Sequence, residues 1–372
     1  MKKPKNWTGL FLLLVCLLLV PIIGLVVYID PYIHYHSPHT DRYYYELEKE
    51  RYVSDGMIRQ YSYDGVISGN SMTQNFRATQ ADQLFGGQTL KATSAGATFH
   101  EIYGLLQKAL RSNPQLRFVI WGLDMQHFDD EPEEMTYDMG PYPTYLYNER
   151  LLDDVYYVLN RDILFGSCGK MMLEALRGGA TGITSLDDYG AMLWERKIYG
   201  KYAVMCRDTF YEMAAQQTLS PVQRERVLAN VRLNVTSLAS DYPDTQFYCF
   251  IAPYSAAWWA DCWERGELEV RLDLEELLIR EILPYENIHL FSWNTLEELT
   301  GDLNNYCDQV HYGAWVNDWM LRQMALDAGR LTEENVDDYL SQERARWENF
   351  DFNALFEQED PPEDPTPAFF RQ

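Results

Sequence analysis

The sequence predicts an α/β protein with a doubly wound, mostly parallel sheet of five strands. Short apolar runs alternate with amphipathic helical patterns between residues 61 and 350, as in parallel sheets whose two faces are both covered by helices. Small or polar residues directly follow several of these runs, and the carboxyl ends of parallel strands share one edge of a sheet. In addition, an uncharged apolar stretch near the N-terminus predicts one transmembrane helix.

Residues 7–29 carry no charge and consist mainly of Leu, Val and Ile. As a helix they would be about 34 Å long, enough for a hydrocarbon core of about 30 Å. Lys2, Lys3 and Lys5 precede the stretch and acidic sequence follows it, so residues 1–6 are expected in the cytoplasm. A cleaved signal peptide is the alternative, but no Ala-x-Ala site ends the run. We therefore expect an uncleaved single-pass anchor in the cell membrane and an extracytoplasmic globular part.

The rest of the chain divides into a stalk, a large domain and a tail. An extracytoplasmic stalk is expected over residues 30–60 and an α/β domain over 61–350. Its five predicted strands are runs rich in apolar and β-branched residues: 65–68, 89–92, 117–122, 246–252 and 288–292. Helical patterns occupy 73–84, 98–112, 221–240, 272–282, 314–327 and 331–349.

The strand–helix rhythm is interrupted between residues 126 and 219. This interruption is too long for a plain loop, so we expect a helical cap inserted over the sheet edge. The acidic, Pro-rich residues 351–372 are expected to be disordered.

Composition excludes some classes of partner and cofactor. The formal net charge of −25 does not favour nucleic acid or bare anionic lipid as a partner. The cysteine spacings match no zinc site, and His100, His127 and His289 have no second motif member beside them. His34, His36 and His39 form a histidine-rich segment that could bind a metal, but no acidic or thiol partner lies in register with them. We therefore predict no metal.

The segment Asp64-Gly-Val-Ile-Ser-Gly-Asn-Ser-Met-Thr73 predicts a buried strand that ends in a turn carrying Ser71. Backbone N–H groups at a helix start after such a turn can stabilise an oxyanion. Far downstream, Asp308 and His311 are separated by two residues, so one short turn could present both. Together these residues predict a nucleophilic serine, a histidine base and an orienting carboxylate. Taken singly, Ser71 could be a helix N-cap and His311 a structural histidine.

Gly69-Asn70-Ser71 and Asp308-x-x-His311 resemble, in order and separation, the two end motifs of the SGNH/GDSL hydrolase superfamily. The Asn305-Tyr-x-Asp-x-x-His-Tyr312 neighbourhood is similar to that of membrane-anchored, extracytoplasmic relatives, including proteins that move acyl groups on cell-envelope polymers. The resemblance covers roughly residues 60–330. It implies a flavodoxin-like, SGNH-type sheet, a catalytic triad of Ser71, His311 and Asp308, and no cofactor.

The resemblance also implies an oxyanion site. Gly96, after the second strand, would offer its backbone N–H, although a turn glycine explains it equally well. The family's third donor is an Asn after the third strand, where this chain has Asp124, and the family's usual Asp before the serine is Asn70 here. An ionised carboxylate beside an oxyanion would repel it, whereas a protonated one could donate.

One aromatic candidate for substrate binding follows the fourth strand. Tyr254 precedes Trp258-Trp259, and these rings could form a platform for a sugar or pack in the core.

The expected function is that of a hydrolase, namely an extracytoplasmic serine acyl esterase, or of an O-acyltransferase. It would act on ester-linked acyl groups of a cell-envelope glycan, a teichoic-acid-like polymer or another acylated carbohydrate. The expected partners are this polymer, the membrane through the N-terminal helix, and a membrane acyltransferase. The alternative is a non-catalytic SGNH-fold scaffold that binds an envelope polymer or a partner acyltransferase, favoured by Asp124 at the amide position.

Overall fold

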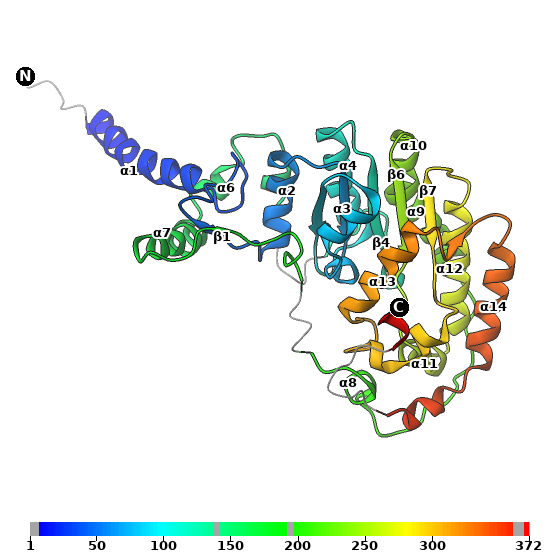
Figure 1. The fold of residues 1–372 in the computed structure, drawn as a ribbon. Coiled ribbons are helices and arrows are strands. Elements are labelled where there is room, and N and C mark those ends of the chain that lie inside the picture. Colours follow the sequence, from blue (N-terminus) through cyan, green and yellow to red (C-terminus); the bar gives the residue numbers. More distant parts are fainter. Residues whose placement is uncertain (1–6, 137–141, 192–196, 360–367, 372) are drawn as a thin grey trace, which may run out of the picture. The chain divides into compact units, whose positions relative to one another are not determined.

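The chain folds into two compact units, each built from two separate stretches of sequence. The N-terminal unit comprises residues 1–61 and 141–185, and the α/β unit comprises residues 62–140 and 186–372. A computed structural model (Figure 1) describes residues 7–136, 142–191, 197–359 and 368–371.

The α/β unit contains a six-stranded sheet in the order β3-β2-β4-β6-β7-β8. Its strands are β2 (Gly65–Gly69), β3 (Thr89–Thr93), β4 (Phe118–Leu123), β6 (Gln246–Ile251), β7 (Ile288–Phe291) and β8 (Arg330–Leu331). The first five strands in this order are parallel, with Ile67 opposite both Lys91 and Ile120, and β8 is antiparallel to β7. Strands β2 and β4 are buried at every position, as expected for strands covered on both faces.

Two groups of helices pack around this sheet. α3 (Ala78–Phe85) contacts α13 (Ala314–Ala325), whereas α12 (Leu268–Ile282) contacts α9 (Pro221–Val231) and α14 (Val336–Asn349). α4 (Phe99–Ser112) contacts η5 (Arg232–Thr236), which continues α9 into α10 (Ser237–Asp241). The unit also contains α8 (Lys201–Met205), α11 (Ala256–Arg265), η1 (Ser71–Thr73), η2 (Met125–His127), η6 (Glu297–Gly301), η7 (Leu303–Asn305), η8 (Phe352–Glu357) and η9 (Ala368–Arg371).

Capping residues explain where two of these helices begin. The Thr98 side chain accepts the N–H of Glu101 at the start of α4. Ser220 and Gln223 form a reciprocal capping box at the start of α9, with Pro221 at the first helical position. Such contacts satisfy N–H groups that a helix start leaves unpaired. The helices predicted at 98–112 and 221–240 are therefore confirmed to within one residue.

The five predicted strands are present, with ends displaced by no more than one residue. The five-stranded count is wrong, because β8 adds a sixth, antiparallel strand whose two residues are too few to give a periodic signal. α11 was not expected. The helix predicted from Thr73 begins at Ala78, because Ser71–Thr73 forms the separate turn η1.

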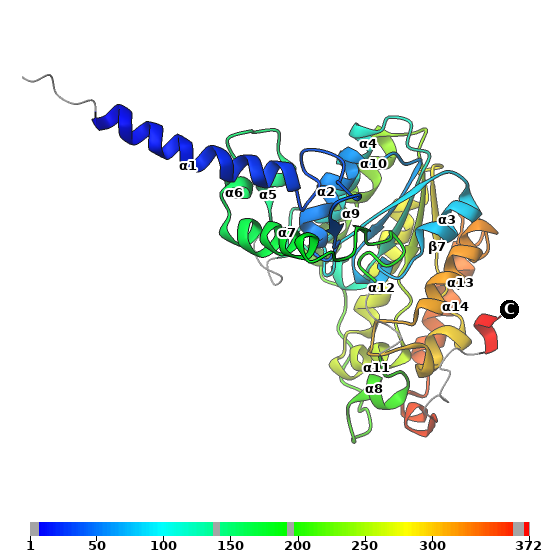
Figure 2. The same ribbon diagram turned by 60° about the vertical axis from the view of Figure 1, so that its left-hand side comes forward.

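The N-terminal unit groups several helices around the end of α1 (Figure 2). Its elements are α1 (Trp7–Ile29), α2 (Glu50–Gln60), α5 (Thr144–Tyr147), α6 (Val155–Val158), η3 (Asp162–Cys168), α7 (Gly169–Leu176) and the paired strands β1 (Tyr44–Tyr45) and β5 (Gly182–Ile183). At its centre the Tyr157 hydroxyl donates to Asp30 Oδ1 at 2.8 Å, and the N–H groups of His34 and Tyr35 also donate to the Asp30 carboxylate.

This packing corrects two expected boundaries. Residues 30–60 are not a separate stalk, because Ile33 and Val53 are fully buried and this segment forms one unit with residues 141–185. Residues 126–219 do not form one inserted cap, because 141–185 joins the N-terminal unit and 186–219 belongs to the α/β unit. Segments 30–60 and 141–185 are separated by 80 residues in the sequence, so local sequence patterns do not reveal that they form one unit.

The C-terminal tail is also more ordered than expected. Phe352 and Leu355 in η8 are buried, and Phe370 packs against Trp319 with the ring centroids 5.7 Å apart. Apolar contacts therefore hold parts of residues 351–372. The proline-rich residues 360–367 lie outside the described part of the chain.

Two carboxyl groups are buried together between α12 and α14. Glu275 and Glu343 are 0% and 1% exposed, and Asn294 Nδ2 donates to both Glu275 oxygens at 3.2 and 3.3 Å. Burial, with the charge of Glu343, raises the pKa of Glu275 well above its usual range. Burial raises the pKa of Glu343 to about 7, although hydrogen bonds from Asn294 and Tyr339 oppose the shift. The pair therefore retains at least one proton near neutral pH.

We expect the α/β unit to lose stability as the pH rises through this range. The folded pKa of Glu343 exceeds the unfolded value of 4.5, so the folded state binds more protons between these values. The stabilisation is complete below about pH 4.5 and is lost as the pH rises through about 7. In the wild type the free energy of unfolding should fall by on the order of 2–3 kcal/mol over this range. In Glu343→Gln this fall should be smaller, as measured by thermal melts from about pH 5 to about pH 8. Glu348→Gln, an exposed change on the same helix, should keep the wild-type slope. An unchanged slope in Glu343→Gln would contradict the assignment.

Candidate active site

Ser71 lies on a tight turn at the carboxyl end of β2. Asn70 caps this turn, since its Oδ1 accepts the N–H of Met72 at 3.1 Å. Gly69 has a φ of +146°, and a Cβ there would come within 2.7 Å of the Thr73 side chain. The turn therefore requires glycine at position 69 and favours a short capping side chain at position 70.

His311 and Asp308 lie on a second tight turn. Tyr306 and Tyr312 pair across it as an antiparallel bridge, and the N–H of Cys307 donates to the His311 carbonyl at 3.0 Å. Inside the turn, Asp308 Oδ1 accepts the N–H of His311 at 2.7 Å. The carboxylate is thus fixed by the backbone of the segment that carries the histidine.

The structure brings the three predicted catalytic residues together. Ser71 Oγ lies 2.8 Å from His311 Nε2, and His311 Nδ1 lies 2.7 Å from Asp308 Oδ2. The His311 side chain is 22% exposed and the Asp308 side chain 50%. Burial tends to raise the pKa of Asp308, but its hydrogen bonds with His311 and the charge of that ring lower it overall. The arrangement can pass a proton from the Ser71 hydroxyl to the imidazole.

Two further donors tie the turns together. The Tyr312 hydroxyl and the Asn317 amide both donate to the Met72 carbonyl, each at 3.0 Å. Met72, Tyr312 and Asn317 are all buried. The carbonyl next to Ser71 is therefore held directly by the residue after His311 and by α13.

A buried lysine from β3 fixes the loop after η1. Lys91 is 0% exposed, and its Nζ donates to the carbonyl oxygens of Gln74, Phe76 and Asp187 at 2.7, 3.2 and 3.0 Å. These contacts stabilise a charge that burial alone would penalise.

Two backbone N–H groups remain available as donors. In the described part of the chain, neither the Ser71 N–H nor the Gly96 N–H donates to a protein acceptor. Gly96 follows β3 with a φ of +61°, and the Ser94 N–H ties the start of its turn to the Gly69 carbonyl at 3.0 Å. The family resemblance implies the Gly96 N–H as an oxyanion donor, and Ser71 lies on the turn whose N–H groups were considered for the same role.

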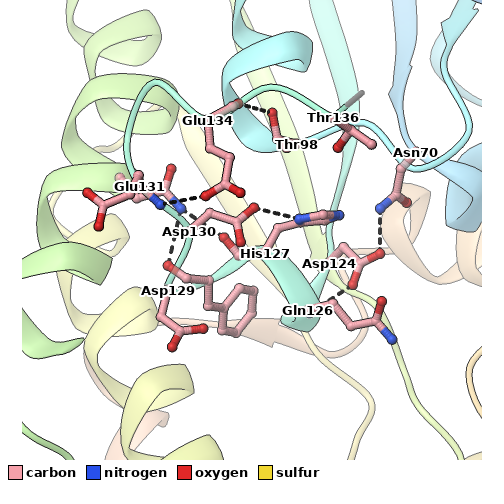
Figure 3. A network of polar contacts seen from close by, with 12 residues as sticks. Asn70, Thr98, Asp124, Gln126, His127, Asp129, Asp130, Glu131, Glu134 and Thr136 are labelled. Atoms are coloured by element: carbon pink, nitrogen blue, oxygen red, sulfur yellow. Dashed lines mark hydrogen bonds and ion pairs between the residues drawn. The ribbon is translucent and has the colours of Figure 1, made fainter. Parts of the chain in front are cut away.

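Asp124 does not replace the expected amide as a donor. Its Oδ2 accepts from Asn70 Nδ2, and its Oδ1 accepts from the N–H of Gln126 (Figure 3). The Tyr254 hydroxyl also donates to Oδ1. Asn70 is 1% exposed and Asp124 5%. The two positions at which the chain departs from the family pattern therefore contact each other, with the amide and the carboxylate exchanged.

Tyr254 is not a substrate platform. Its ring is 0% exposed and packs edge-on against Trp258 with the centroids 4.8 Å apart. Burial, followed by the charge and hydrogen bond of Asp124, raises the Tyr254 pKa well above its usual range, so its hydroxyl remains a donor. The Tyr254 ring is therefore not accessible to a substrate, and its hydroxyl supports Asp124 from the core by donating a hydrogen bond.

A second His/Asp pair was missed in the sequence. His127 Nδ1 lies 2.6 Å from Asp130 Oδ2, and Figure 3 shows the ring between Asp130 and Asp124. Burial lowers the His127 pKa, but the Asp130 hydrogen bond and the charges of Asp124, Asp130 and Glu101 raise it overall. The available signal was the His127-x-x-Asp130 spacing, which mirrors Asp308-x-x-His311.

Comparisons with known proteins do not assign the chain to a family. No family model and no curated protein matches it. A solved structure from Streptococcus pneumonia, provisionally described as a platelet activating factor, matches with 10% identity and a TM-score of 0.37. The match covers 78% of this chain and 91% of that chain. A TM-score below 0.5 does not establish a common fold, so no functional conclusion follows from it.

The exchange of Asn70 and Asp124 can be tested by reversing it. Asn70→Asp alone sets a carboxylate against Asp124 in a buried site and should destabilise the protein by about 3 kcal/mol. Adding Asp124→Asn should recover most of this loss, because the new amide can donate to the new carboxylate while its oxygen still accepts from Tyr254 and Gln126. Chemical denaturation of the two single variants and the double variant measures the coupling. Additive single effects would show that the residues do not act as a pair.

Proposed function

We propose that the chain is an extracytoplasmic serine acyl esterase or O-acyltransferase of the SGNH type. One observation carries the proposal: the Ser71 hydroxyl, the His311 ring and the Asp308 carboxylate form a continuous hydrogen-bonded chain. This is the order of nucleophile, base and orienting carboxylate that acyl transfer requires. The order β3-β2-β4-β6-β7 of the parallel strands, with the serine after β2, supports the SGNH-type proposal.

In the first half-reaction, Ser71 Oγ attacks the acyl carbon of an ester while His311 Nε2 accepts the hydroxyl proton. Asp308 stabilises the resulting imidazolium through Nδ1. The N–H groups of Ser71 and Gly96 are the proposed donors to the oxyanion. When the tetrahedral intermediate collapses, the bond to the alcohol breaks, the alcohol takes the proton from His311, and the acyl group remains on Ser71.

In the second half-reaction, His311 accepts a proton from water or from a sugar hydroxyl as its oxygen attacks the acyl carbon. The bond to Ser71 Oγ breaks and the proton returns to the serine. Water gives an esterase, and a sugar hydroxyl gives an O-acyltransferase. The serine itself carries the acyl group, so the proposal requires no cofactor.

The proposed substrate is an acylated cell-envelope glycan or teichoic-acid-like polymer, because a membrane anchor would hold the site near such polymers. Among the described helices, only α1 is long and apolar enough to cross a membrane. Its end packs within the N-terminal unit: Val26 and Ile29 are 0% exposed, and the Tyr45 hydroxyl donates to the Ile29 carbonyl at 2.6 Å. Cleavage near this point would remove core side chains, which supports an uncleaved anchor. The lysines at positions 2, 3 and 5 support a cytoplasmic N-terminus.

The second candidate is a non-catalytic scaffold that binds an envelope polymer or a membrane acyltransferase. It is favoured by Asp124, whose two oxygens both accept hydrogen bonds. This side chain therefore offers no third oxyanion donor, and loss of one such donor typically reduces the rate about 10²–10³-fold.

A fluorophosphonate probe distinguishes the two candidates. We expect the full-length protein to be labelled, since His311 activates the Ser71 hydroxyl, and labelling should disappear in Ser71→Ala. Ser167→Ala, in the N-terminal unit, should label like the wild type. Absence of labelling in folded wild-type protein would support the scaffold and contradict catalysis.

Asp308→Asn should lower kcat for a model ester about 10³-fold, because the amide no longer fixes the histidine tautomer or stabilises its cation. The change should act on kcat more than on KM. Asp302→Asn, at a carboxylate in the same region whose Oδ1 accepts the N–H of Asn304, should keep most of the activity. Comparable losses in the two variants would argue against the orienting role of Asp308.

A further inference from the structure

The N-terminal unit exposes several large apolar side chains from the turn before α6 to the end of α7. Six of them are between 46% and 89% exposed: Leu151, Leu152, Tyr156, Phe165, Leu173 and Leu176. Soluble surfaces usually expose such residues singly. Here they occur within a single short segment of 26 residues, which we call the apolar strip (151–176).

The apolar strip has a second apolar side that is already buried. Tyr157, Ile163 and Cys168 are no more than 2% exposed, and α6 and η3 pack against α1. Tyr156 lies in α6 and Leu152 in the turn just before it, and both side chains are exposed. Helical segments that are apolar on two sides are typical of elements with another apolar surface beside them.

The position of the apolar strip along α1 indicates what that surface is. α1 has 23 residues, and a hydrocarbon core of about 30 Å would take about 20 of them. Counted from Trp7, the core would end near Val26, where α1 becomes buried against its neighbours. Figures 1 and 2 both show α6 and α7 grouped at this end of α1. The exposed side chains are therefore expected at the depth where hydrocarbon gives way to headgroups.

The charges around the apolar strip favour neither sign of lipid. Residues 150–177 hold four basic and four acidic side chains, in contrast to the strongly negative chain as a whole. Attachment there would depend on apolar burial and not on anionic headgroups.

We propose that the apolar strip lies in the outer interface of the bilayer as a second membrane contact beside α1. The inference rests on the proposed membrane anchor. A single crossing helix leaves the attached unit free to rotate about the helix axis. A lateral contact would restrict this rotation and hold the N-terminal unit against the lipid surface.

Depth-dependent fluorescence quenching tests the proposal on the full-length protein. An environment-sensitive fluorescent amino acid is placed at one position at a time. Positions 152 and 165 report on the apolar strip, and position 13 reports on α1. Position 326 in the α/β unit is the matched control, because Leu326 is 74% exposed. The proteins are reconstituted in phosphatidylcholine vesicles containing lipids spin-labelled near the headgroup or near the end of the acyl chain.

We expect strong quenching of positions 152 and 165 by the shallow spin label, unchanged at high salt. Position 13 should be quenched most by the deep label, and position 326 by neither. Quenching at 13 without quenching at 152 and 165 would overturn the interfacial contact while leaving the anchor intact. No quenching at 13 would instead contradict the anchor. Cross-linking of 152 to another membrane protein without quenching in vesicles would assign the surface to that protein and overturn the lipid contact.

Discussion

The contact between the Met72 carbonyl and the donors of Tyr312 and Asn317 connects two turns that lie about 240 positions apart in the chain. Each turn is rigid by itself, through Gly69 and Asn70 on one side and the Asp308 carboxylate on the other. Their own rigidity does not place them relative to each other. The hydrogen bonds to the Met72 carbonyl fix the two turns relative to each other. The 2.8 Å distance between Ser71 Oγ and His311 Nε2 depends on these bonds. The proposed chemistry therefore depends on tertiary packing as much as on the reactive groups.

Asn70 and Asp124 show how a contact changes the interpretation of two unusual residues. Considered separately, each weakens the resemblance to an acyl-transfer site. In the folded chain they are one hydrogen-bonded pair, supported by the buried Tyr254 hydroxyl. Both Asp124 oxygens accept hydrogen bonds, so this side chain offers no donor, which leaves the N–H groups of Ser71 and Gly96 as the proposed backbone donors. The proposed oxyanion site therefore has fewer donors than the family pattern.

The sequence was sufficient for the parallel strands because strands covered on both faces form apolar runs with abrupt ends, as in β4. It also indicated Ser71, Asp308 and His311 through their residue types and spacings, and the structure places these three side chains within hydrogen-bond distance of one another. It did not reveal β8, which has two residues, or the Asp130 partner of His127, because a single His-x-x-Asp spacing without a second motif does not identify a contact. The assembly of residues 30–60 with 141–185 was missed because it depends on non-local contacts, such as the Tyr157 hydroxyl with Asp30.

The discontinuous make-up of the N-terminal unit affects any attempt to prepare the α/β unit alone. Deleting only the first 61 residues would leave segment 141–185 without the chain that covers Tyr157 and Ile163. The truncated product would then present freshly uncovered core residues to water and tend to aggregate. A soluble version would need both stretches removed, with a short linker joining the chain ends near residues 140 and 186.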